Sequence, residues 1–185
     1  QVHPDIGAFE FFTCTGFPEV QVVNNSFTVC NGADVQFEVK EPEAGNTYYW
    51  YNAAAGGDFV HTGTSLAIPS LTGQVEYWVE ARTAEGCASL QRVHVRAESL
   101  SPLTQAPVVK IDTVTVNSIR FKWTPVPGAM AYQVSRDGIH FTQPSSGAGG
   151  LTHTMTGLNA SDSVSIVVRA LALLECQQTV SERTG

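Results

Sequence analysis

The feature that most constrains the fold is a regular alternation of apolar and polar residues. Residues 34–40, 75–82 and 92–97 all alternate with a period of two. Successive side chains of a β-strand point to opposite faces, whereas an amphipathic helix repeats every ~3.6 residues. The alternation therefore predicts half-buried antiparallel strands, with one face in a core and the other in water.

The second half of the chain repeats this pattern. Residues 118–123 alternate, and residues 151–156 and 164–170 supply two more strands. Turn-rich pieces such as 55–58 and 85–87 separate strands in the first half. Short strands at this spacing predict sandwiches or barrels.

A polar stretch with two prolines and no alternation divides the chain of 185 residues near its middle. We expect a first domain at 18–98, a linker at 99–106 and a second domain at 107–185. Domains of ~80 residues fold alone with a modest margin. Residues 1–17 are expected to be the tail of a preceding module.

Composition excludes two classes of partner. The formal net charge is −7, so the chain lacks the basic surface of a nucleic-acid binder. No apolar run approaches the ~18–20 residues that span a bilayer, so membrane insertion is not expected.

The first half resembles a known family. The segments that carry the resemblance are 29–32 (Val-Cys-Asn-Gly), 48–51 (Tyr-Tyr-Trp-Tyr) and 86–89 (Gly-Cys-Ala-Ser). Their order and spacing over residues 18–97 are similar to those of Ig-like modules that recur in very large secreted proteins of gliding and polymer-degrading bacteria.

The second half resembles a fibronectin type III module, through residues 119–123, 132–138 and 156–170. One position departs from that family: six residues after Leu158, where a corner tyrosine is expected, the chain has Val164. The two resemblances imply an all-β fold of two tandem antiparallel β-sandwiches, Ig-like and then fibronectin type III-like.

A third resemblance lies at the start of the chain. Residues 5–10 (Asp-Ile-Gly-Ala-Phe-Glu) look like the segment that closes many bacterial parallel β-helix domains. This resemblance implies a preceding β-helix module, a type associated with polysaccharide binding or cleavage.

The chain has four cysteines, and none has the C-x-x-C spacing of a zinc or redox site. The Ig-like resemblance places Cys30 at the start of one strand and Cys87 just after another, and it implies a disulfide between them. Two buried free thiols are the alternative. For Cys14 and Cys176 three alternatives stay open: a bond with each other, bonds with neighbouring modules, or free thiols.

Aromatic residues form a candidate ligand patch. If Trp50 is in the core, as the resemblance implies, alternation turns Tyr49 and Tyr51 outward, and Trp78 faces the same way on a neighbouring strand. Exposed rings suit sugar rings or a partner protein. The interpretation we favour is that the rings merely cover the sheet or pack on an adjoining domain.

Catalysis has little support in the sequence. The five histidines are scattered without metal-ligand spacing, and there is no G-x-S-x-G motif. Residues 147–150 are glycine-rich but lack the lysine of a phosphate-binding loop. We therefore expect no enzyme activity, no metal and no cofactor.

Two tripeptides, Asp112-Thr113-Val114 and Asp162-Ser163-Val164, resemble the acceptor of a bacterial surface O-glycosylation system. The resemblance makes Thr113 and Ser163 candidate glycosylation sites.

Taken with the resemblances, these features predict a non-catalytic interaction or spacer segment of a large extracellular or cell-surface protein, adhesin-like and exported by the type IX route. The expected partners are neighbouring domains of the same polypeptide, the export or surface-anchoring machinery, and polysaccharide. The alternative is a pair of accessory carbohydrate-binding modules of a secreted polysaccharide-active enzyme.

Overall fold

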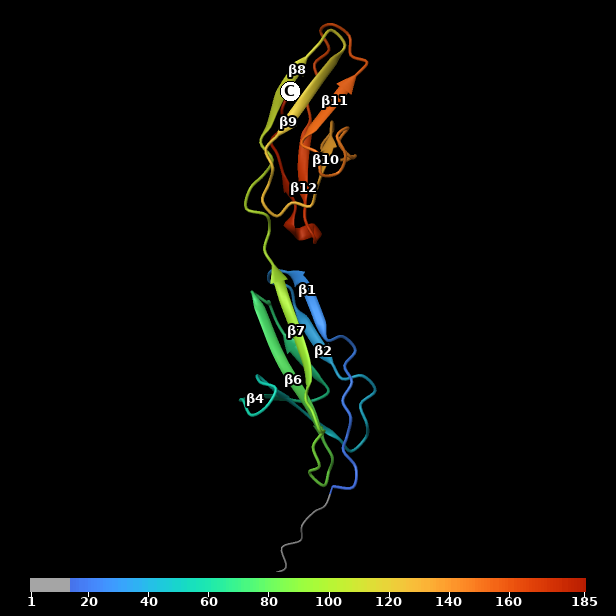
Figure 1. Ribbon diagram of the computed structural model, residues 1–185, viewed down its shortest axis with the longest axis vertical. Helices are drawn as coiled ribbons and strands as arrows, with labels where there is room; N and C mark the ends of the chain where they lie inside the picture. Colours follow the sequence, from blue (N-terminus) through green and yellow to red (C-terminus); the bar gives the residue numbers. More distant parts are fainter. Residues whose placement is uncertain (1–13) are drawn as a thin grey trace, which may run out of the picture. The chain divides into compact units, whose positions relative to one another are not determined.

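The computed structural model describes residues 14–185, which are built from β-strands and one short 3₁₀ helix, η1 (Glu175–Gln177) (Figure 1). Contacts divide the chain into two compact units. Of the described residues, the first unit contains residues 14–28 and Gly32–Glu98, and the second contains Val29–Asn31 and Ser99–Gly185. The predicted boundaries at 98 and 107 stay a prediction, and the β-helix resemblance at residues 5–10 lies outside the described residues.

The first unit has a five-stranded and a two-stranded sheet. The five-stranded sheet has the order β1 (Ser26–Cys30), β7 (Val93–Leu100), β6 (Gln74–Arg82), β3 (Thr47–Tyr51) and β4 (Phe59–Thr62). The two-stranded sheet pairs β2 (Val35–Glu38) with β5 (Ser65–Ile68).

The core of the first unit follows the alternation. Val35 and Phe37 on β2 are buried, while Gln36 between them is exposed. Trp50 is fully buried, and its indole N–H donates to the carbonyl of Gly63 at 2.9 Å. The centroids of the Phe37 and Trp50 rings lie 6.4 Å apart, which places Trp50 in the core as predicted.

β1 differs from the other strands of its sheet in how it pairs with its neighbour. The N–H of Arg96 donates to the carbonyl of Asn25, and further along both strands the N–H of Asn31 donates to the carbonyl of Leu100. From the first of these bonds to the second, the residue number rises on both strands, so β1 lies parallel to β7. β7 in turn is antiparallel to β6 (Figure 1).

The second unit has two three-stranded sheets. One has the order β11 (Thr152–Thr156), β9 (Ser118–Trp123) and β8 (Val109–Val114). The other has the order β10 (Ala131–Ser135), β12 (Val167–Leu171) and β13 (Thr179–Val180).

Its core lies between these sheets, where Phe121 and Val168 are fully buried. Val164 belongs to the same cluster, so the hydroxyl of a corner tyrosine is replaced by apolar packing. A different tyrosine of the same core bonds to the backbone: the hydroxyl of Tyr132 accepts a hydrogen bond from the N–H of Val126 at 2.7 Å.

The predicted fold class is confirmed: the described part of the chain is all-β and forms two β-sandwiches in tandem, whose strands pair antiparallel except for β1 with β7. No helix in residues 14–185 has the length and apolar character needed to span a membrane.

Candidate binding face and disulfide framework

The structure brings the three predicted patch residues together on the outer face of the five-stranded sheet. Tyr51 on β3 lies directly opposite Trp78 on β6, and Tyr49 lies two residues before Tyr51 on the same face. Phe59 on the edge strand β4 joins them, with its ring centroid 6.3 Å from each of the two tyrosine centroids. We call these four residues the aromatic face.

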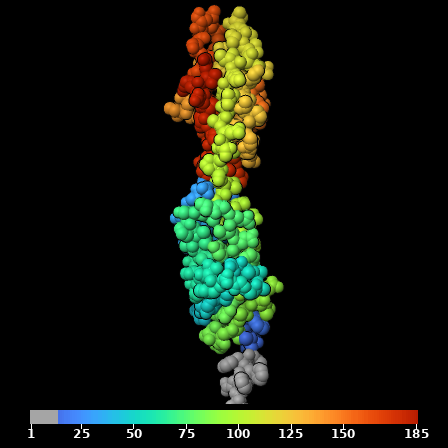
Figure 2. All heavy atoms as spheres, turned by 90° about the vertical axis from the view of Figure 1, so that its left-hand side faces the viewer, coloured from blue at the N-terminus to red at the C-terminus, as the bar shows by residue number. Residues whose placement is uncertain are grey.

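Sequence reasoning missed Phe59. Its neighbour Val60 is also apolar, so β4 has no alternation that would assign either side chain to a face. All four residues of β4 are exposed, and the segment around it, in cyan, lies at the surface in the space-filling view (Figure 2).

The ring faces are largely occupied within the molecule. The guanidinium of Arg92 lies 3.4 Å from the centroid of the Tyr51 ring, and that of Arg82 lies 5.0 Å from the Tyr49 centroid. His94 stacks on Trp78, with 4.7 Å between centroids. Cations placed over aromatic rings in this way are attracted by the ring quadrupole. Phe59, at 57% exposure, is the member of the aromatic face that stays open.

A buried carboxylate organises this face. Glu80 is only 7% exposed, and its two oxygens accept hydrogen bonds from the Nε atoms of Arg82, at 2.7 Å, and Arg92, at 2.8 Å. The hydroxyl of Tyr51 donates to the same carboxylate at 3.3 Å. Arg92 also donates to the carbonyl of Ala53, which ties the loop after β3 to the sheet.

Burial acts to raise the pKa of Glu80, but the hydrogen bonds and charges of Arg92 and Arg82 outweigh it, so the pKa lies below its ordinary value of 4.5. The carboxylate is thus held ionised and fully paired. Its role is to fix the two arginines over the tyrosine rings, and alternation alone, which only turns Glu80 outward, does not predict it.

Because the pKa of Glu80 is lower in the folded than in the unfolded chain, its contribution to stability is present above pH 4.5 and is lost as the pH falls through the folded value. We expect Glu80→Gln to cost about 2 kcal/mol at pH 7 and to flatten the loss of stability between pH 5 and pH 3. Urea unfolding of the whole chain, with the first unit monitored by hydrogen exchange, measures both effects.

Glu76→Gln is the matched control, since the Glu76 side chain is 41% exposed and its carboxylate lies 3.5 Å from Nε2 of His94. Equal acid sensitivity of wild type and Glu80→Gln would contradict the role given to the buried carboxylate.

All four cysteines are paired, but not as predicted. Cys14 bonds to Cys87, with 5.7 Å between Cα atoms, and Cys30 bonds to Cys176, with 6.0 Å. The predicted Cys30–Cys87 bridge is therefore wrong, and of the alternatives for Cys14 and Cys176 none anticipated these partners.

The strand directions explain the correction. β1 is parallel to β7, and β7 is antiparallel to β6, so β1 and β6 run in opposite directions. Cys30 ends β1, and Cys87 follows the end of β6. The two cysteines consequently lie at opposite ends of the sheet, beyond the Cα separation of about 7 Å that a disulfide can span.

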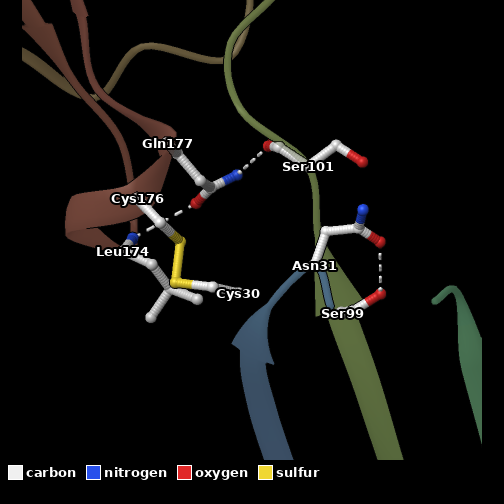
Figure 3. The surroundings of a disulfide bond; sticks show 7 residues. All are labelled: Cys30, Asn31, Ser99, Ser101, Leu174, Cys176 and Gln177. Carbon is white, nitrogen blue, oxygen red and sulfur yellow. Dashed lines mark hydrogen bonds between the residues drawn. A yellow bond between two sulfur atoms is a disulfide. The ribbon is translucent and has the colours of Figure 1, made fainter. Parts of the chain in front are cut away.

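The Cys30–Cys176 bond is surrounded by hydrogen bonds of the second unit (Figure 3). Cys176 lies in η1, and the side-chain amide of the next residue, Gln177, donates to the carbonyl of Ser101 at 3.1 Å. The N–H of Leu103 donates to the backbone carbonyl of Gln177, also at 3.1 Å. On the other side of the bond, the hydroxyl of Ser99 donates to the side-chain oxygen of Asn31.

The second unit holds a hollow of about 270 Å³ whose lining includes Ser135, Asp137, His140 and His153. The Ser135 hydroxyl donates to Asp137 rather than to a histidine, and Asp137 accepts the N–H groups of residues 139 and 140. Burial lowers the pKa of His153, whose Nδ1 accepts the N–H of Ser145. This is a loop-closing network without the serine-to-histidine bond of a hydrolase.

No group of three or more His, Cys, Asp or Glu side chains in the described part of the chain could hold a metal ion. Thr113 and Ser163 are both exposed. Asp112, next to Thr113, forms ion pairs with Lys122 at 2.7 Å and Arg120 at 3.4 Å. Glycosylation at either hydroxyl stays a prediction.

Residues 18–99 match a protein family described as an Ig-like domain, CHU_C associated. This match confirms the Ig-like resemblance of the first half. No curated protein matches the chain in sequence.

Similar solved structures include titin domains A168–A170, at 17% identity and a TM-score of 0.53, with 86% of this chain covered. The chain spans 61% of that titin chain. Murine CEACAM1b is similar at 12% identity and a TM-score of 0.50, covering 89% of this chain and 96% of that one. At these identities the likeness shows the fold alone.

Fibronectin(III)-like modules of CbhA from Clostridium thermocellum match at 14% identity over 90% of both chains. Their TM-score is 0.44, which is too low to carry an argument.

Proposed function

We propose that this chain is a non-catalytic spacer and interaction segment of a large secreted or cell-surface bacterial protein, adhesin-like in role. The observation that carries the proposal is the use of all four cysteines in two long-range disulfides, with sequence separations of 73 and 146 residues. Disulfides persist in oxidising compartments and are rare in the cytosol.

The size of the closed loops fits a chain that works outside the cell. In the chain-entropy model, loops of these lengths stabilise the folded state by about 4–5 kcal/mol each. Sandwiches of ~80 residues have a modest stability margin of their own, so such bonds are a large fraction of the total. The family match over residues 18–99 supports the same setting.

The finer parts of the proposal come from the sequence resemblance. They are an origin in gliding bacteria, export by the type IX route, and contact with the export or surface-anchoring machinery and with neighbouring domains of the same polypeptide.

An immunoblot of the source cells with antibody against this chain tests the proposal. We expect a band much larger than 19.8 kDa that disappears when intact cells are treated with protease, because the protein is displayed outside. An intracellular protein probed on the same blot controls for lysis. A protease-resistant band near 19.8 kDa would refute the secreted-segment proposal.

Carbohydrate binding is the second candidate, favoured by the gathering of Tyr49, Tyr51, Trp78 and Phe59 on one face. The arginines and His94 that lie over the rings argue against it, because a sugar would have to displace them to stack. We therefore rank it below the spacer role.

A binding assay with plant and algal polysaccharides separates the two candidates. We expect no measurable retention of the wild-type chain. Retention that is lost in Tyr49→Ala and Trp78→Ala, but kept in Val116→Ala at an 87% exposed site of the second unit, would favour carbohydrate binding instead.

A further inference from the structure

We propose that the Cys30–Cys176 disulfide carries pulling force past both β-sandwiches, so that tension along the chain does not unfold them. The bond joins two residues that are 146 positions apart. Its biological use rests on the proposed spacer function, whereas the mechanical behaviour follows from covalent connectivity.

The path of force is set by which residues the bond connects. Tension that enters at the N-terminal side runs along the backbone to Cys30, crosses the disulfide to Cys176, and leaves along residues 176–185. Residues 31–175 form a side loop that carries no tension. The buried apolar residues of both units, from Val35 to Ala170, lie in this side loop.

The second disulfide does not offer a shorter path. Cys14 bonds to Cys87, but the chain from Cys87 back to Cys30 is 57 residues long, whereas the direct backbone from Cys14 to Cys30 is 16 residues. The Cys14–Cys87 bond therefore stays slack under tension. It closes a loop of the first unit without taking part in force transmission.

Among the described residues, the regular elements that remain in the path are two edge strands and the last two residues of η1. β1 is the outer strand of the five-stranded sheet, and β13 is the outer strand of its three-stranded sheet. β13 is held by the pairs Arg169–Val180 and Ala170–Thr179 on β12. Peeling either strand lengthens the tether by a few residues only, because the disulfide stops further extension.

The size of the effect is large. Residues 1–30 and 176–185 extend to at most about 130 Å in total, at roughly 3.4 Å per residue. Opening the Cys30–Cys176 bond alone adds about 250 Å of extensible chain, because the Cys14–Cys87 bond still closes off residues 15–86. Opening both bonds adds about 500 Å. The oxidised chain is thus a short, stiff tether, and the reduced chain is a long, extensible one.

Single-molecule stretching of the oxidised chain, held by its two ends, tests this directly. We expect a total gain in length below about 130 Å, and an additional gain of about 500 Å when a dithiol reductant is added under load. Gains of several hundred ångströms without reductant would overturn the proposal. This measurement uses the wild-type chain, so it does not depend on the folding of a variant.

Two matched variants assign the effect to one bond. Cys30→Ser/Cys176→Ser keeps Cys14–Cys87, so the path becomes residues 1–14 and 87–185, and we expect a maximum of about 380 Å. Cys14→Ser/Cys87→Ser keeps the bypass and should stay below about 130 Å. A maximum extension below about 130 Å in the first variant, or well above about 130 Å in the second, would contradict the assignment. Because the purified chain is used, the result is independent of the protease test on cells.

Discussion

The parallel pairing of β1 with β7 is the constraint on which the rest of the framework depends. It brings Cys30 to the same end of the sheet as Leu100, where the chain leaves β7, and it keeps Cys30 away from Cys87. Cys30 is then free to bond to Cys176 in η1. If β1 ran the other way, Cys30 would lie at the end of the sheet where Cys87 follows β6. A bond between them would leave residues 87–185 in the tension path, and the path would run through the core of the second unit.

The outer face of the five-stranded sheet shows how a charged group can stabilise a surface without creating chemistry. Glu80 is buried, yet its negative charge is balanced by two arginines whose guanidinium groups also cover two tyrosine rings. A charge that is fully paired in this way has little capacity to act as an acid or base. The arrangement suits a rigid module whose surface contacts neighbours, and it leaves Phe59 as its open apolar side chain.

Much of the fold could be predicted from the sequence, because period-two alternation is a local signal. Residues 118–123 form β9 with the predicted limits, and Trp50 is buried as the resemblance implied. The disulfide partners could not be predicted, because they depend on the relative direction of β1 and β6, which no local pattern records. The pairing of Glu80 with Arg82 and Arg92 was missed for a similar reason: Arg92 lies 12 residues away and reaches Glu80 only through the fold.

Mapping the disulfides under non-reducing conditions tests the central claim most directly. Cleavage after glutamate residues, at Glu19, Glu38, Glu85 and Glu175, places each cysteine on a separate peptide. The structure predicts that peptide 11–19 is linked to 86–98 and that peptide 20–38 is linked to 176–182. A link between 20–38 and 86–98 would restore the Cys30–Cys87 bridge, and it would remove the covalent path that carries tension past the two sandwiches.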